Sequence, residues 1–181
     1  ARARISPPAT GPRLIAAGSW HEVEGNIVRN RMHVLSALGR PRFFHDKTLP
    51  LESKALGVEE LTPSFRIAVL IAEDVLIAFA ICRDFCEAQI TQVYRALDVD
   101  LIVVPSYGDT ATILAHRQQA AILNTDPGTR TFVVQQTIPE EVTAAGVGFV
   151  LPPAGNPAAL EPEAMRVPAP GRRQQISFKK V

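Results

Sequence analysis

The chain has 181 residues, 46% of them hydrophobic and 20% charged, which suits one soluble globular domain with a sizeable core. Nineteen basic and eighteen acidic residues leave a formal net charge of +1, so no overall positive field is available to hold nucleic acid. The longest apolar run, Val75 to Cys82, has eight residues, whereas a helix needs about 20 to span a bilayer. These counts argue against partners of either kind, nucleic acid or membrane.

Cysteine usage indicates the compartment. Only Cys82 and Cys86 are present, too few for the disulfide framework of a small secreted protein. Residues 1–12 contain charge and prolines but no apolar stretch like that of a signal peptide. The sequence therefore predicts a cytoplasmic protein.

Proline and glycine divide the first part of the chain into short strands and turns. After an irregular entry, the predicted strands are 14–20, 31–38 and 42–45, with a polar connection over 21–26 and a turn at 39–41. Residues 47–63 show no clear period. We expect a long irregular loop there, and loops of this length are often functional.

The second part of the chain alternates between strands and helices. The predicted strands are 65–72, 75–81, 101–105 and 131–136, and the predicted helices are 87–98 and 110–124. Glu73 and Asp74 separate the first two strands, which predicts a tight hairpin buried on both faces. The order of the later elements predicts right-handed parallel crossovers in an α/β sheet.

Apolar spacing predicts which helix positions face that sheet. The expected buried residues are Ile90, Val93, Tyr94 and Leu97 in the first helix, and Ile113, Leu114, Ala121 and Ile122 in the second. Beyond residues 148–151, six prolines in 152–170 predict an irregular surface segment.

Cys82 lies where a buried strand ends, about five residues before a predicted helix begins. Ligands of α/β sheets bind outside the carboxyl ends of the strands, and helix N-termini stabilise a thiolate. The position therefore suits a nucleophile. A cysteine that packs as a small buried hydrophobe would occupy the same place.

The surroundings of Cys82 resemble the nucleophile region of the nitrilase, or carbon–nitrogen hydrolase, superfamily, where a strand-end cysteine is followed by x-Asp. The matching residues are ICRDF from Ile81, Glu87, and DVDLIVVPS from Asp98. Upstream, LIAAGSW and NRMHVLSALGRPRFFHDKTLP are similar to the family's glycine-containing strand, its hairpin and its catalytic-lysine segment. Downstream, AHRQQAAILNTDPGTRTFVVQQ and GFVLPPAG resemble later elements, so the resemblance covers residues 13–155.

This resemblance implies a four-layer α-β-β-α sandwich over 13–155 that lacks the family's first elements, preceded by an irregular entry over 1–12 and followed by a proline-rich tail over 156–181. The implied activity is hydrolysis of a non-peptide amide, carbamoyl or nitrile group through a cysteine thioester. The implied partners are a small-molecule amide or nitrile substrate and further copies of the chain in a homo-oligomer. No cofactor or metal is implied.

Two residues take catalytic positions by the resemblance. Cys82 matches the nucleophile and Lys47 the catalytic lysine, one of only four lysines in the chain. An ammonium near a thiol favours the thiolate, and it stabilises the oxyanion formed when sulfur attacks a carbon. The backbone N–H of Arg83 would be a second oxyanion donor.

Two carboxylates of the family pattern are harder to place. The family's general base is a glutamate at the end of an early strand, but no acidic residue precedes Glu22. We therefore expect the base to be absent from residues 1–181. Neither Glu22 nor Glu24 is assigned to that role. A second glutamate often supports the family's lysine, and the spacing leaves three candidates, which are Glu52, Glu59 and Glu60.

Two alternatives follow from these observations. A domain without its base could keep the fold only for binding or assembly. Cys82 and Cys86 could instead form a redox pair, although packing is the simpler role for Cys86. The four histidines are scattered without the spacing of metal ligands.

Overall fold

The computed structural model describes residues 14–53, 57–72, 74–126, 128–137, 148–151 and 163–164. The chain forms two compact units, residues 1–68 and residues 69–181, each with its own sheet. The predicted entry over 1–12 and most of the predicted proline-rich tail lie outside the described residues. No helix of the described part is both long and apolar enough to cross a membrane.

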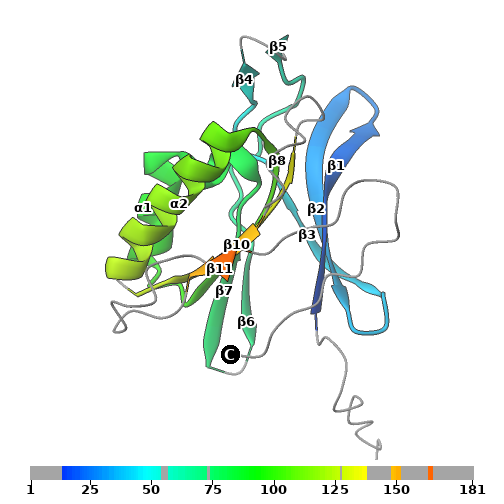
Figure 1. The fold of residues 1–181 in the computed structure, drawn as a ribbon. Helices are drawn as coiled ribbons and strands as arrows, with labels where there is room; N and C mark the ends of the chain where they lie inside the picture. The colour runs from blue at the N-terminus through cyan, green and yellow to red at the C-terminus, as the bar shows by residue number, and fades with distance from the viewer. Residues whose placement is uncertain are drawn as a thin grey trace, which may run out of the picture. The chain divides into compact units, whose positions relative to one another are not determined.

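The first unit contains an antiparallel sheet in the order β1-β2-β3 (Figure 1). Its strands are β1 (Leu14–Glu24), β2 (Ile27–Ser36) and β3 (Pro41–Asp46). The first hairpin turns at Gly25, whose φ of +62° favours glycine. Two short strands, β4 (Glu52–Ser53) and β5 (Gly57–Val58), pair within the region predicted as an irregular loop.

The prediction of a polar connection over 21–26 is wrong, because β1 continues to Glu24 and β2 already begins at Ile27. Glu22 and Glu24 belong to the strand because both carboxylates pair across the sheet with Arg31. Polar side chains on one face of an antiparallel sheet thus read like a loop when their partners are not known.

The second unit contains a mixed sheet in the order β11-β10-β9-β8-β7-β6. Its strands are β6 (Val69–Ala72), β7 (Val75–Phe79), β8 (Leu101–Gly108), β9 (Arg130–Thr137), β10 (Gly148–Leu151) and β11 (Glu163–Ala164). Strands β7, β8 and β9 are parallel, and the crossovers between them contain α1 (Ala88–Ala96) and α2 (Thr110–Thr125). The predicted hairpin and parallel crossovers are confirmed, and both helices lie on the same side of the sheet (Figure 1).

Burial differs from the prediction at the edge of this sheet. Strand β6 is an edge strand rather than one buried on both faces, and the side chain of Ile71 is 75% exposed. An apolar run alone cannot distinguish an edge strand from a central one, because the difference lies in which neighbours the sheet supplies.

The predicted helix faces are also partly wrong. In α1, Ile90 and Tyr94 are buried as predicted, but Val93 is exposed, as is Leu97, the residue after the helix. In α2, Leu114 and Ile122 are exposed, and the buried side chains include His116, Ala120 and Leu123. A polar residue, His116, thus occupies the core-facing side of α2, which apolar spacing could not indicate.

Candidate active site

Lys47 directly follows β3 in the first unit, and its side chain is 2% exposed. Its backbone is held on both sides, because its N–H donates to the carbonyl of Asn30 (2.8 Å) and its carbonyl accepts from the N–H of Ser64 (3.2 Å). The sheet and the following loop therefore fix the start of this side chain.

The ammonium of Lys47 forms an ion pair with Glu59. Of the three glutamates that the sequence left open, Glu59 is the one brought to Lys47, whereas Glu52 and Glu60 are exposed. The Glu59 carboxylate also accepts from Asn30 Nδ2 (2.7 Å) and from the N–H of Leu51 (2.8 Å). Burial alone would raise the pKa of Glu59, but the hydrogen bonds from Lys47, Asn30 and Leu51 hold it below its usual value.

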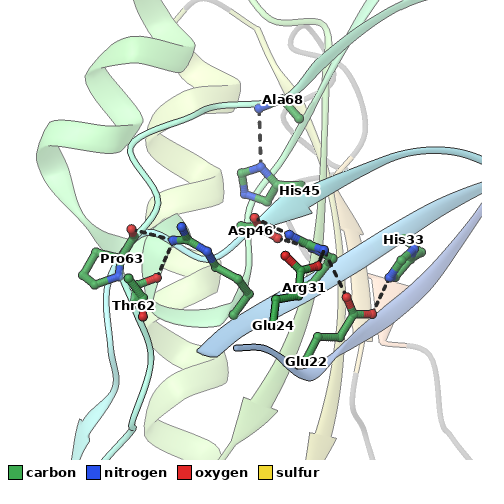
Figure 2. A network of polar contacts seen from close by, with 10 residues as sticks. Glu22, Glu24, Arg31, His33, His45, Asp46, Thr62, Pro63 and Ala68 are labelled. Atoms are coloured by element: carbon green, nitrogen blue, oxygen red, sulfur yellow. Dashed lines mark hydrogen bonds and ion pairs between the residues drawn. The ribbon is translucent and has the colours of Figure 1, made fainter. Parts of the chain in front are cut away.

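The loop that supplies Glu59 is tied to β2 by the Arg29 guanidinium. Arg29 Nη1 donates to the carbonyls of Thr62 and Pro63, both at 2.7 Å (Figure 2). The N–H of Thr62 also donates to the carbonyl of Val28 at 2.7 Å. The end of the segment after Lys47 is thus anchored to β2, close in sequence to Glu59.

A second charged cluster includes Asp46, the last residue of β3, which directly precedes Lys47. Arg31 contacts Asp46 through two hydrogen bonds of 2.6 and 3.0 Å and also contacts Glu22 and Glu24 (Figure 2). The hydrogen bonds that Arg31 donates to Asp46 and Glu24 raise its pKa. Glu22 and Glu24 therefore act as partners of Arg31 in this sheet.

Cys82 begins a short 3-10 helix, η1 (Cys82–Cys86), three residues after the end of β7. Its φ is +50°, in a region that non-glycine residues rarely adopt. Such strain costs on the order of 1–3 kcal/mol and persists only where the surroundings enforce it. The side chain is buried, and Sγ donates to the carbonyl of Tyr107 near the carboxyl end of β8 (3.5 Å).

Helix α1 fixes the strand that leads to Cys82. The buried Tyr94 hydroxyl donates to the carbonyl of Phe79, the last residue of β7, at 3.0 Å. Burial and the nearby charge of Asp84, itself buried in η1, raise the pKa of Tyr94. The tyrosine therefore remains a hydrogen-bond donor at neutral pH.

Cys86, at the end of η1, is a free thiol like Cys82. Its sulfur lies 3.1 Å from Nδ1 of His116. Burial, together with the nearby Cys82, raises the pKa of Cys86 to about 12, and burial lowers the pKa of His116 to about 4. At neutral pH the pair is therefore an uncharged thiol beside an uncharged imidazole. Among the described residues, no group of three or more His, Cys, Asp or Glu side chains could hold a metal ion.

The two buried histidines predict a specific pH dependence. Burial lowers the pKa of both His45 and His116 to about 4, whereas an unfolded histidine titrates near 6.5. The unfolded state thus binds more protons below pH 6.5, and stability falls as the pH is lowered towards 4. Each histidine is expected to lower the free energy of unfolding by about 2 kcal/mol between pH 7 and pH 5. Urea unfolding at the two pH values measures this loss, and imidazole NMR titrations with midpoints near 6.5 would contradict it.

Sequence reasoning missed two residues of these sites. Asn30 could have been found from hairpin register, because a turn at 39–41 places the strand before it opposite the residues that lead to Lys47. His116 had no comparable signal, because its contacts with Cys86 and with Ser106 at 3.0 Å form only when η1, α2 and β8 come together.

No protein-family model matches the sequence, and no curated protein matches it. Solved structures do match. Nit3 of Saccharomyces cerevisiae, a member of branch 10 of the nitrilase superfamily, gives a TM-score of 0.61 at 14% identity, covering 82% of this chain and 61% of Nit3. XC1258 of Xanthomonas campestris is a CN-hydrolase superfamily protein with an arsenic adduct in its active site. It gives a TM-score of 0.61 at 16% identity, and the match covers 82% of this chain and 57% of XC1258.

A variant of an amidase from Nesterenkonia sp., whose structure shows Michael addition of acrylamide at the active-site cysteine, gives a TM-score of 0.56 at 19% identity. The match covers 84% of this chain and 61% of the amidase. The chain thus spans about three-fifths of the length of these proteins. The mixed α/β class is confirmed, and the chain has the fold of the nitrilase, or carbon–nitrogen hydrolase, superfamily.

Proposed function

We propose that the chain carries the nucleophile and the catalytic lysine of a cysteine-dependent carbon–nitrogen hydrolase that acts on a small amide, carbamoyl or nitrile compound. The observation that carries the proposal is Cys82, a non-glycine residue with a φ of +50° just beyond a parallel strand of a nitrilase-type fold. Ligands of α/β sheets bind outside the carboxyl ends of such strands. Strained residues of this kind gather at active sites.

In the proposed reaction, Sγ of Cys82 attacks the electrophilic carbon of the substrate. For an amide, the thiol proton passes to a general base and then to the leaving nitrogen, so that the amine departs and a thioester remains. Water then hydrolyses the thioester, returning the proton to sulfur and releasing the acid. The joint role of Lys47 and Cys82 rests on the family pattern in the sequence.

Lys47 would supply the positive charge for the oxyanion of the tetrahedral intermediate, together with the backbone N–H of Arg83. Glu59 supports this role because its carboxylate accepts from Lys47, Asn30 and the N–H of Leu51. These bonds occupy the carboxylate and lower its pKa, so Glu59 positions the ammonium and is a poor proton carrier. We leave the general base unassigned, because the carboxylates of Glu22, Glu24 and Glu59 are already paired with Arg31 or Lys47.

Covalent labelling tests the nucleophile without requiring turnover. The chain is incubated with fluoroacetamide at pH 7, digested, and analysed by peptide mass spectrometry. We expect an acetamide adduct on Cys82, because the thiol of Cys86 has a pKa raised to about 12 and reacts poorly. The Cys86→Ser variant is expected to keep the adduct on Cys82, and the Cys82→Ser variant is expected not to label. An adduct on Cys86 with none on Cys82 would overturn the assignment.

A further inference from the structure

His116 lies at the centre of a chain of polar contacts in the second unit, next to the element that carries Cys82. Its Nδ1 contacts Cys86 Sγ at 3.1 Å, and its Nε2 contacts Ser106 Oγ at 3.0 Å. Ser106 Oγ in turn lies 3.5 Å from Gln135 Oε1, and Gln135 Nε2 donates to the carbonyl of Asp109 at 2.7 Å. Helix α2, strands β8 and β9 and the 3-10 helix η1 are thus joined through one imidazole.

The direction of the protons in this chain follows from its far end. Gln135 donates from its amide nitrogen to Asp109, so its Oε1 is free to accept from the Ser106 hydroxyl. The Ser106 oxygen then accepts a hydrogen bond from Nε2–H of His116, and Nδ1 of His116 accepts one from the thiol of Cys86. Burial lowers the pKa of His116 to about 4, which keeps the imidazole in this neutral form at pH 7.

Both contacts of His116 lead to Cys82. Cys86 ends the 3-10 helix that Cys82 begins, and the aromatic ring of Phe85 in the same helix packs against the imidazole with ring centroids 5.7 Å apart. At the other ring nitrogen, His116 contacts Ser106, which immediately precedes Tyr107. The carbonyl of Tyr107 accepts a hydrogen bond from the Cys82 thiol. The imidazole is fully buried, so its bonds are shielded from competition with water.

We propose that His116 is a positioning residue for the nucleophile: it clamps η1 to the end of β8 and so holds the Cys82 thiol in its strained, attacking orientation. A residue with a positive φ keeps that conformation only if its surroundings over-determine it, and His116 binds the two elements that flank the thiol. The inference deepens the proposed function and rests on Cys82 being the nucleophile.

Three substitutions at His116 separate positioning from packing. His116→Phe keeps a ring against Phe85 but loses both hydrogen bonds. His116→Asn places an amide near the position of Nδ1 and can retain the contact with Cys86, whereas His116→Gln reaches towards Ser106. Folding of each variant is checked by urea unfolding. Cys86→Ala, which removes only one of the bonds at a half-buried position, provides a variant with a smaller structural change.

The readout compares two probes of the Cys82 thiol. Fluoroacetamide tests attack by sulfur on the carbon next to an oriented amide, with loss of fluoride. The neutral disulfide 2,2′-dithiodipyridine tests mere access to the sulfur. In His116→Phe we expect the fluoroacetamide rate at Cys82 to fall at least about tenfold, because small misplacements of a catalytic group lower reaction rates strongly. The dithiodipyridine rate should be unchanged or higher. His116→Asn, His116→Gln and Cys86→Ala should each give an intermediate loss.

Equal fluoroacetamide rates in the parent chain, His116→Phe and Cys86→Ala would overturn the positioning role and leave His116 as a packing residue. A parallel fall of both probe rates would also overturn it, because a general loss of structure or access affects both reagents. If fluoroacetamide does not label Cys82 in the parent chain, the proposed function itself fails, so the two failures are distinguishable.

Discussion

Lys47→Met is expected to lower the free energy of unfolding by about 3–5 kcal/mol, because removing one partner of a buried ion pair leaves the other charge uncompensated. The Lys47 side chain is 2% exposed and that of Glu59 is 12% exposed, so water can replace the lost ammonium only poorly. Urea unfolding at pH 7, followed through the fluorescence of the single tryptophan, Trp20 in β1, measures the loss in the unit that holds the pair.

The double variant Lys47→Met/Glu59→Gln is expected to recover most of this stability. The glutamine is uncharged, and its amide oxygen can still accept from Asn30 and from the N–H of Leu51. Glu60→Gln is the matched control on the neighbouring residue, because Glu60 is exposed and its replacement should cost less than about 0.5 kcal/mol. If Lys47→Met unfolds at the same urea concentration as the parent chain, the ion pair does not stabilise this unit.

The segment around Cys82 could be predicted from the sequence because its signals are local. Branched apolar runs, a two-residue turn at Glu73 and Asp74, and a change to helical spacing after Glu87 define strand, hairpin and helix without knowledge of distant partners. The parallel order of β7, β8 and β9 then follows from the handedness of crossovers. Those elements place Cys82 just beyond the carboxyl end of a strand in both the prediction and the structure.

The supports of the candidate site could not be predicted in the same way, because they depend on contacts between residues far apart in the chain. Glu59 reaches Lys47 only because the loop folds back along β2, where Arg29 holds Thr62 and Pro63. His116 lies on the buried side of α2 because Ser106 and Cys86 offer it partners. Polar residues that are buried with partners do not follow apolar periodicity, so apolar spacing predicts the helix faces only in part.

The charged sheet of the first unit illustrates the same limit. Glu22 and Glu24 read as loop residues in isolation, but with Arg31 opposite them they form part of a strand. Both carboxylates form ion pairs with Arg31, so neither is assigned a catalytic role. The remaining carboxylate of the proposed mechanism, the general base, therefore has no candidate in β1.

The largest chemical effect is expected at Cys82 when the charge of Lys47 is removed. A nearby positive charge favours the thiolate, which is the form of cysteine that reacts. The Lys47→Met/Glu59→Gln variant keeps the neighbourhood uncharged and is expected to fold. Lys47→Arg retains the positive charge and is the matched control.

The central proposal, which rests on the family pattern in the sequence, is that Lys47 activates Cys82. The rate of Cys82 alkylation by iodoacetamide at pH 7 tests it most directly. Peptide mass spectrometry follows the modification of Cys82 in the parent chain, in Lys47→Arg and in Lys47→Met/Glu59→Gln. We predict that the rate falls about tenfold in the double variant, because the proposed positive charge no longer favours the reactive thiolate, and by much less in Lys47→Arg. The same rate in all three proteins would contradict the claim and favour a domain that uses this fold without cysteine catalysis.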